Sequence, residues 1–297
     1  MIEEAWNEYR GWAKRARTLQ TSSRRWSRAA FVCAGLAAIF GTAATQVTEG
    51  LLGRALVFLA AVMAAVTPVL GREILSVGRE AQWIRARATA EAIKSECFRF
   101  AAQLGDYGGS SAKNAFVARR NALSEPAERA GLTPLYDPVS TAADARRPPV
   151  PLTAAWYMEN RLGEQMQFYA KGQAENEEAV ARLRTLAFGS AVIAAILGVA
   201  GSNFGQEWFG PWIGVMTTIA ATIMAYALLD RQQYLAATYG AMAARLSRVK
   251  EMFSNDAVDL SALITTTEDL LQSEHAAWTE PTTQTIAAHP VASDKTK

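Results

Sequence analysis

The chain has 297 residues, half of them apolar and 20% charged, with a formal net charge of +2. Its length and apolar content allow a sizeable core, which excludes disorder as a description of the whole chain. The small net charge, without a continuous basic stripe, excludes a typical nucleic-acid-binding protein, so no nucleic-acid partner is expected. Two cysteines and two histidines are too few and too scattered for a disulfide framework or a metal site.

Four apolar stretches are long enough to cross a membrane, which takes roughly 20 residues of helix. They lie at about residues 29–48, 53–71, 185–206 and 208–229, and only Arg54, at the edge of the second, carries a charge. None has the polar face of a soluble helix. The first is not a cleavable signal peptide, because it starts far from the N-terminus and a second stretch follows at once. The sequence therefore predicts an all-α membrane protein with four transmembrane helices.

The connections inside each pair of stretches are short, which predicts two antiparallel hairpins with tips near Glu49 and Glu207. Arginines gather at the opposite ends of the spans: Arg24, Arg25, Arg28, Arg72, Arg79, Arg85, Arg87, Arg182, Arg184 and Arg231. The tips hold Arg54 alone. Because arginine and lysine favour the cytoplasmic side, we expect both tips to face outward and both termini and all long polar helices to be cytoplasmic.

The two halves of the chain repeat one layout, a charged helix, a hairpin and another charged helix. We therefore predict a first unit at residues 1–104, a Pro/Gly-rich linker at 105–154, a second unit at 155–279 and a disordered tail at 280–297. Within the linker, a short helix is expected from Ala112 to Glu125.

The helices that follow the hairpins carry apolar residues at spacings of three and four, the coiled-coil pattern. The first seam comprises Ile74, Val77, Ala81, Ile84, Ala88, Ser95, Phe98 and Ala102. The second comprises Leu235, Tyr239, Met242, Leu246, Val249 and Phe253. No helix breaker separates either seam from its span, so each is interpreted as a continuation of that span. Packing within one chain and packing between subunits both remain open.

A search for chemistry finds no phosphate-binding glycine loop, no paired-histidine zinc motif and no nucleophile elbow. We therefore expect no catalytic residue, no cofactor site and no metal site, and a protein that is not an enzyme. The absence of charge inside the spans also argues against a proton pump or an ion-coupled transporter.

The spans do carry hydroxyl and amide side chains. These candidate pore-lining residues are Thr42, Thr45, Gln46, Thr67, Ser202, Asn203, Thr217, Thr218 and Thr222. They can serve interhelical packing or line a narrow, weakly selective pore. Pro68 is a candidate kink or gate, and Gly198 and Gly214 lie in small-residue patterns that permit close helix packing.

Three motifs carry a resemblance to a known family. They are Arg161-x-x-x-Gln165-x-x-Phe-Tyr169, Ala90-Glu-Ala-Ile-Lys-Ser-Glu96 and Glu268-Asp-Leu-Leu-x-x-Glu274-His-x-x-Trp278. In their order and spacing the chain resembles two tandem SLATT domains, the SMODS- and SLOG-associating 2TM effectors. The resemblance implies a membrane effector of bacterial conflict and anti-phage systems, in the cytoplasmic membrane, that oligomerises and breaches the bilayer after a signal. It brings no catalytic residues.

These observations together predict a homo-oligomeric pore or membrane-disrupting effector, gated through its cytoplasmic helices. Its expected partners are the lipid bilayer, further copies of itself and a nucleotide-sensing or signal-generating cytoplasmic protein. The alternative is a non-conducting membrane scaffold whose cytoplasmic helices recruit a partner.

Overall fold

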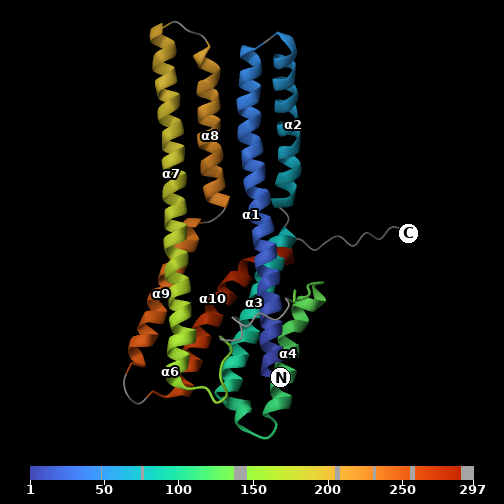
Figure 1. The fold of residues 1–297 in the computed structure, drawn as a ribbon, viewed down its shortest axis with the longest axis vertical. Helices are drawn as coiled ribbons and strands as arrows, with labels where there is room; N and C mark the ends of the chain where they lie inside the picture. Colours follow the sequence, from blue (N-terminus) through green and yellow to red (C-terminus); the bar gives the residue numbers. More distant parts are fainter. Residues whose placement is uncertain are drawn as a thin grey trace, which may run out of the picture. The chain divides into compact units, whose positions relative to one another are not determined.

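The computed structural model describes residues 1–47, 49–74, 77–136, 146–204, 208–229, 232–254 and 258–288. Side chains at 72–74, 77–80, 204, 229 and 275–288 lie outside this description. The described residues contain helices and no strand (Figure 1). They fall into two compact units. The core unit comprises Met1–Thr21, Val77–Phe168 and Met242–Lys297, and the hairpin unit comprises Ser22–Ser76 and Tyr169–Ala241.

The four predicted spans are present as apolar helices long enough to cross a membrane. The first hairpin pairs the end of α1 (Ile2–Gln46) with α2 (Gly50–Ile74). The second pairs the end of α7 (Glu164–Phe204) with α8 (Phe209–Leu229). The fold is therefore that of an all-α membrane protein, as predicted. Gly50 begins α2 with a φ of +82°, a conformation that glycine adopts at little cost in the tight first tip.

The core unit is built around α3 (Val77–Ala101), which packs against α4 (Ala112–Arg129) and α10 (Leu260–Ala288) (Figure 1). A 3₁₀ turn, η1 (Gly105–Gly108), joins α3 to α4, while α6 (Ala154–Tyr157) and the π-helical η2 (Met158–Gly163) lead into α7. All six residues from 93 to 98 are buried, so α3 is covered on every side there. The predicted seam residues Ser95 and Phe98 are buried there, but so are their neighbours, because a central helix buries its whole circumference.

The second predicted seam lies on α9 (Gln232–Met252). Tyr239, Met242, Leu246 and Val249 are buried, which confirms the apolar face. Whether α2 continues into α3 and α8 into α9 depends on residues 75–76 and 230–231, outside the described residues. Parts of two predicted spans, Thr48 and 205–206, also lie outside them.

The linker contains the expected helix, but α4 runs through Pro126 to Arg129. Proline in the last turn removes only one backbone hydrogen bond, and the burial of Ala127 beyond it rewards the extra turn. Gly131, at φ +74°, closes the helix: its N–H donates to the carbonyl of Glu128, and Leu132 N–H donates to that of Ala127. This is the Schellman arrangement.

Two further boundaries concern the linker and the tail. Residues 137–145 of the linker lie outside the described residues, whereas Leu135 N–H donates to the carbonyl of Gly11 on α1 at 3.0 Å. The helix α10 extends to Ala288, so residues 280–288, expected to be disordered, are helical, and 289–297 lie outside the description. Because both halves of the chain contribute to both compact units, the division at 1–104, 105–154 and 155–279 stays a sequence-level prediction.

Within the hairpin unit, α7 and α9 cross closely through two glycines. A Cβ on Gly172 would lie 2.5 Å from Cδ2 of Tyr239, and a Cβ on Gly240 would lie 2.9 Å from Cδ of Gln173. Each helix thus places a side chain over a glycine of the other. The Tyr169 ring meets that of Tyr239 edge-on at 5.5 Å between centroids. The polar Gln173 therefore lies in the contact between the two helices.

Candidate functional site

The hydroxyl groups on the spans satisfy their donors within their own helices. Thr67, Thr218 and Thr222 each donate to the carbonyl four residues earlier, at 2.7–2.8 Å. Thr45, Ser202 and Thr217 bond to the preceding turn in the same way, as does the amide of Asn203. Such bonds remove the cost of burying a lone donor in an apolar environment. They leave each oxygen with acceptor capacity for a neighbouring helix or for water.

The hydroxyl residues come from four different helices. Thr42 and Thr45 lie on α1, Thr67 on α2 and Ser202 on α7, whereas the threonines of α8 share one helix. On α8, Thr217 and Thr218 are exposed in the hairpin unit, and Gly214 lies one turn away. Gln46 is exposed at the end of α1. A pore lined by these residues would therefore need faces from several helices or several chains.

The two candidate packing glycines have different surroundings. A Cβ on Gly198 would lie 3.8 Å from Cδ1 of Ile213, so this glycine faces α8 inside its own hairpin. A Cβ on Gly214 would meet nothing within 4 Å. Gly214 is therefore available to a neighbouring helix that is not part of the same chain's packing.

Pro68 lies inside α2. Proline has no N–H for the carbonyl of Ala64 and crowds that carbonyl, which weakens the helix locally. The adjacent Thr67 hydroxyl donates to the carbonyl of Met63 at 2.8 Å. This is where α2 bends most easily, but whether it acts as a gate stays a prediction.

The core unit contains a second set of polar side chains, centred on a buried arginine. Arg161, from η2, is 1% exposed and Glu268, from α10, is 0% exposed. The guanidinium donates twice to the carboxylate, from Nε to Oε1 and from Nη2 to Oε2, both at 2.9 Å. The third nitrogen, Nη1, lies 3.7 Å from a carboxylate oxygen of Glu91 on α3. One arginine thus joins three helical segments, and we call Tyr157, Arg161, Glu268 and Glu91 the arginine cluster.

The local fold places these side chains. The Thr153 hydroxyl accepts from Trp156 N–H at 3.3 Å and caps α6. The following π-turn changes the register of the helix. Tyr157, four residues before Arg161, then donates its hydroxyl to Oε1 of Glu268 at 2.8 Å. The Arg161 guanidinium also lies 5.0 Å from the centroid of the Phe98 ring, within cation–π range.

Two opposing effects, burial and ion pairing, determine the charge states of the arginine cluster. Burial alone would raise the pKa of Glu268, but the charge and hydrogen bonds of Arg161 outweigh it, so the pKa lies below its ordinary value. Burial alone would lower the pKa of Arg161, and Glu268 reverses this so that it is raised. Burial, followed by the charge of Glu268, raises the pKa of Tyr157 well above normal. The pair is therefore ionised and the tyrosine neutral at physiological pH.

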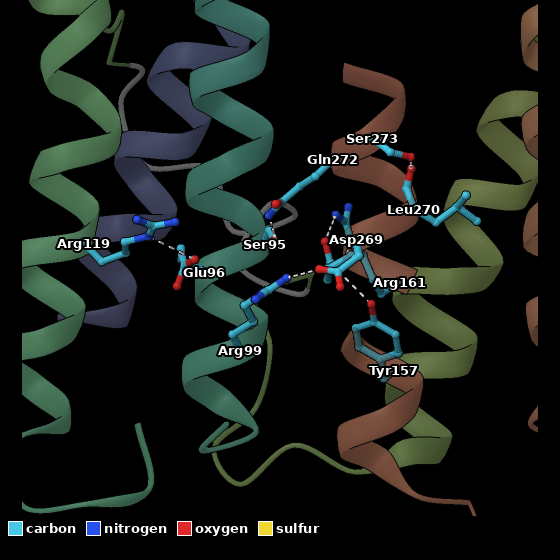
Figure 2. Close-up of polar contacts among 11 residues, drawn as sticks. Ser95, Glu96, Arg99, Arg119, Tyr157, Arg161, Asp269, Leu270, Gln272 and Ser273 are labelled. Carbon is cyan, nitrogen blue, oxygen red and sulfur yellow. Dashed lines mark hydrogen bonds and ion pairs between the residues drawn. The ribbon is translucent and has the colours of Figure 1, made fainter. Parts of the chain in front are cut away.

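Weaker polar contacts extend the network along α3 (Figure 2). Arg99 donates to Asp269 at 2.6 Å, and Gln272 donates to the Ser95 hydroxyl at 3.2 Å. On the opposite side, Arg119 lies 3.6 Å from Glu96. These contacts bind α10 and α4 to α3, but the cluster offers no exposed nucleophile. Among the described residues, no group of His, Cys, Asp and Glu could hold a metal ion.

The arginine cluster joins the three sequence motifs that carry the family resemblance. Arg161, Glu91 and Glu268 each come from a different motif. Sequence reasoning singled out these motifs but did not predict that their charged residues meet. The signal available in the sequence was charge: the motif of Arg161 carries a cation, and the motifs of Glu91 and Glu268 carry carboxylates. The side chains of His275 and Trp278 in the third motif lie outside the described residues.

Comparison with known families gives two matches. Residues 157–278 match the SMODS and SLOG-associating 2TM effector domain 1. Residues 8–115 match a family described as protein of unknown function (DUF4231). Each range contains one of the two hairpins, in agreement with the predicted tandem units. No curated protein and no solved structure matches the chain.

Proposed function

We propose that this chain, whose residues 157–278 match the SMODS and SLOG-associating 2TM effector domain 1, is an effector that opens a pore. Several copies would assemble in the cytoplasmic membrane of a bacterium and make it permeable to ions after a cytoplasmic signal. The four helices that are long and apolar enough to cross a membrane support the location in a membrane. The conducting and oligomeric parts rest on the surface of α8.

The observation that carries the pore is the uncovered polar and small face of α8. Thr217 and Thr218 are exposed, and Gly214 has open space where a side chain would begin. In a bilayer there is little hydrophobic force between helices, so association depends on close packing, and small residues allow it. A second copy of the chain can approach α8 at Gly214 without displacing any described atom within 4 Å.

The same face supplies the chemistry of a weakly selective pore. The threonine hydroxyls already donate to their own backbone, so their oxygens can accept from water while the donors stay satisfied. The spans place no carboxylate or ammonium group at mid-membrane depth, and such a pore would discriminate poorly between ions.

The signal would reach the pore through the core unit. We propose that this unit and both termini lie in the cytoplasm, because arginines flank the spans at the ends away from the tips. A nucleotide-sensing or signal-generating partner would act on its helices. A reporter that is active only outside the cytoplasm, inserted after Glu49, should be active, and the same reporter at the C-terminus should be silent.

The function is tested by membrane potential, measured with a voltage-sensitive dye during induced expression in bacteria. Wild type, expressed with its genomic neighbours, should depolarise the cells. Gly214→Leu should abolish depolarisation at equal membrane abundance, because leucine blocks the approach of a second copy. Gly189→Leu is the matched control: a Cβ there also meets nothing within 4 Å, but on α7. Oligomers that never depolarise the cells would favour the non-conducting scaffold.

A further inference from the structure

The helices that lead into the two hairpins differ in charge. In the 20 residues before the first span, 9–28, there are seven cations and no carboxylate: Arg10, Lys14, Arg15, Arg17, Arg24, Arg25 and Arg28. In the 20 residues before the second span, 165–184, three cations are balanced by Glu175, Glu177 and Glu178. The two halves of the chain share a layout, so the basic character of the helix before the first hairpin is not a requirement of the hairpin fold itself.

The cations nearest the first span lie on the surface of the hairpin unit. Arg25 and Arg28 are exposed and Arg24 is partly exposed. On a helix, residues four apart share a face, so Arg24 and Arg28 lie one above the other with Arg25 beside them. Trp26, between them in sequence, is a large aromatic side chain that is 41% exposed.

Contacts with α8 hold this end of α1 in place. Nε of Arg28 lies 3.5 Å from the hydroxyl of Tyr226, and the Phe31 ring meets the Tyr226 ring edge-on at 5.1 Å between centroids. The arginines are therefore presented from a packed part of the hairpin unit, directly beside the apolar span. In the second hairpin, Arg182 forms an ion pair with Glu178 on its own helix.

We propose that Arg24, Arg25 and Arg28 bind the phosphate groups of anionic phospholipids in the leaflet next to them. Guanidinium groups form strong, paired hydrogen bonds with phosphate. Cations immediately beside a transmembrane helix attract anionic headgroups. Trp26 suits the headgroup level, where amphipathic aromatic rings are favoured. The occupant is a lipid rather than a soluble anion, because the cations line one helix beside the bilayer. The proposal requires that the chain spans a membrane, and it does not depend on conduction.

The test is lipid retention by the purified full-length chain. The protein in detergent is offered equal amounts of phosphatidylglycerol and phosphatidylcholine, and the lipids that stay bound are counted by native mass spectrometry. Wild type should retain phosphatidylglycerol in several-fold preference. Arg24→Gln/Arg25→Gln/Arg28→Gln should reduce this preference to near equality. The matched control, Arg182→Gln, removes a cation that is paired with Glu178 and should keep the wild-type preference.

A single substitution distinguishes the loss of lipid binding from misfolding. Arg25→Gln changes an exposed side chain and should give a preference between those of wild type and the triple variant, while thermal unfolding is unchanged. Three results would overturn the proposal. The first is an unchanged preference in the triple variant, and the second is an equal loss in the control. The third is displacement of phosphatidylglycerol by millimolar inorganic phosphate, which would indicate a site for soluble anions.

Discussion

The core unit and the hairpin unit satisfy their polar groups in opposite ways. In the core unit, polar side chains bond between helical segments, as Arg161 does with Glu268 and Tyr107 with Glu96. In the hairpin unit, the hydroxyls bond to the preceding turn of their own helix, as Thr218 and Thr222 do. Specificity therefore depends on different features in the two units. Directional contacts decide which helices of the core unit meet, whereas the shape of small residues decides how the spans meet.

Replacement of Arg161 in the core unit should have the largest effect on stability. Arg161→Met leaves Glu268 buried without its charge partner, which costs about 3–5 kcal/mol in the free energy of unfolding. We expect a large fall in the unfolding midpoint of the purified protein, measured by circular dichroism.

The double variant Arg161→Met/Glu268→Leu is the control for that loss. Because it removes both charges, it should recover most of the stability lost by the single variant. A double variant as unstable as the single one would show that the packing around Arg161, rather than the ion pair, dominates.

The glycine crossing of the hairpin unit gives the next largest effect. In Gly172→Ala, the new methyl group would lie 2.5 Å from the rigid Tyr239 ring, and overpacking of this kind costs about 1–3 kcal/mol. In Gly240→Ala, the obstacle is the end of the flexible Gln173 side chain, so the loss should be smaller. Thermal unfolding of both variants in one detergent tests this order, and equal losses would contradict it.

Acid should weaken the core unit through Glu268. Its pKa is lowered in the folded state from an unfolded value of about 4.3, so the paired carboxylate stabilises the fold above that pH. Stability should then fall as the pH drops below about 4 and towards the folded pKa. Glu268→Gln should flatten this acid dependence in unfolding midpoints measured from pH 7 to pH 3. An unchanged dependence would assign it to other carboxylates.

Removal of the exposed ion pair on α7 should have the smallest effect on stability. Arg182 and Glu178 are 71% and 62% exposed, and pairs of this kind contribute at most about 1 kcal/mol. Arg182→Gln should therefore leave the unfolding midpoint nearly unchanged. A loss comparable to that of Arg161→Met would remove the distinction between buried and surface pairs.

The sequence predicted the spans well because the bilayer imposes a length and an apolar composition that can be read locally. It also predicted the buried face of α9, where residues such as Met242 and Leu246 recur at helical spacing. It did not predict that Arg161 and Glu268 meet, since 107 residues separate them. It also missed the full burial of α3 around Cys97, because the apolar seam marks only one of the faces that this surrounded helix buries.

The candidate pore was predictable only as a composition. The threonines of α8 could be recognised in the sequence, but the difference between Gly198, which faces Ile213, and Gly214, which faces open space, needed the structure. Whether Thr217 and Thr218 line a pore depends on contacts between copies, and those contacts are a property of the assembly.

The most direct test of the account is ion flux from vesicles that contain the purified chain, together with the size of the assembly in the same vesicles. We predict that wild type forms oligomers that let ions cross the vesicle membrane, as reported by an ion-sensitive dye trapped inside. Gly214→Leu should form smaller assemblies and leave the vesicles ion-tight. The signal is supplied by adding the proteins of the neighbouring genes. Wild-type oligomers that remain ion-tight with those proteins present would contradict the pore.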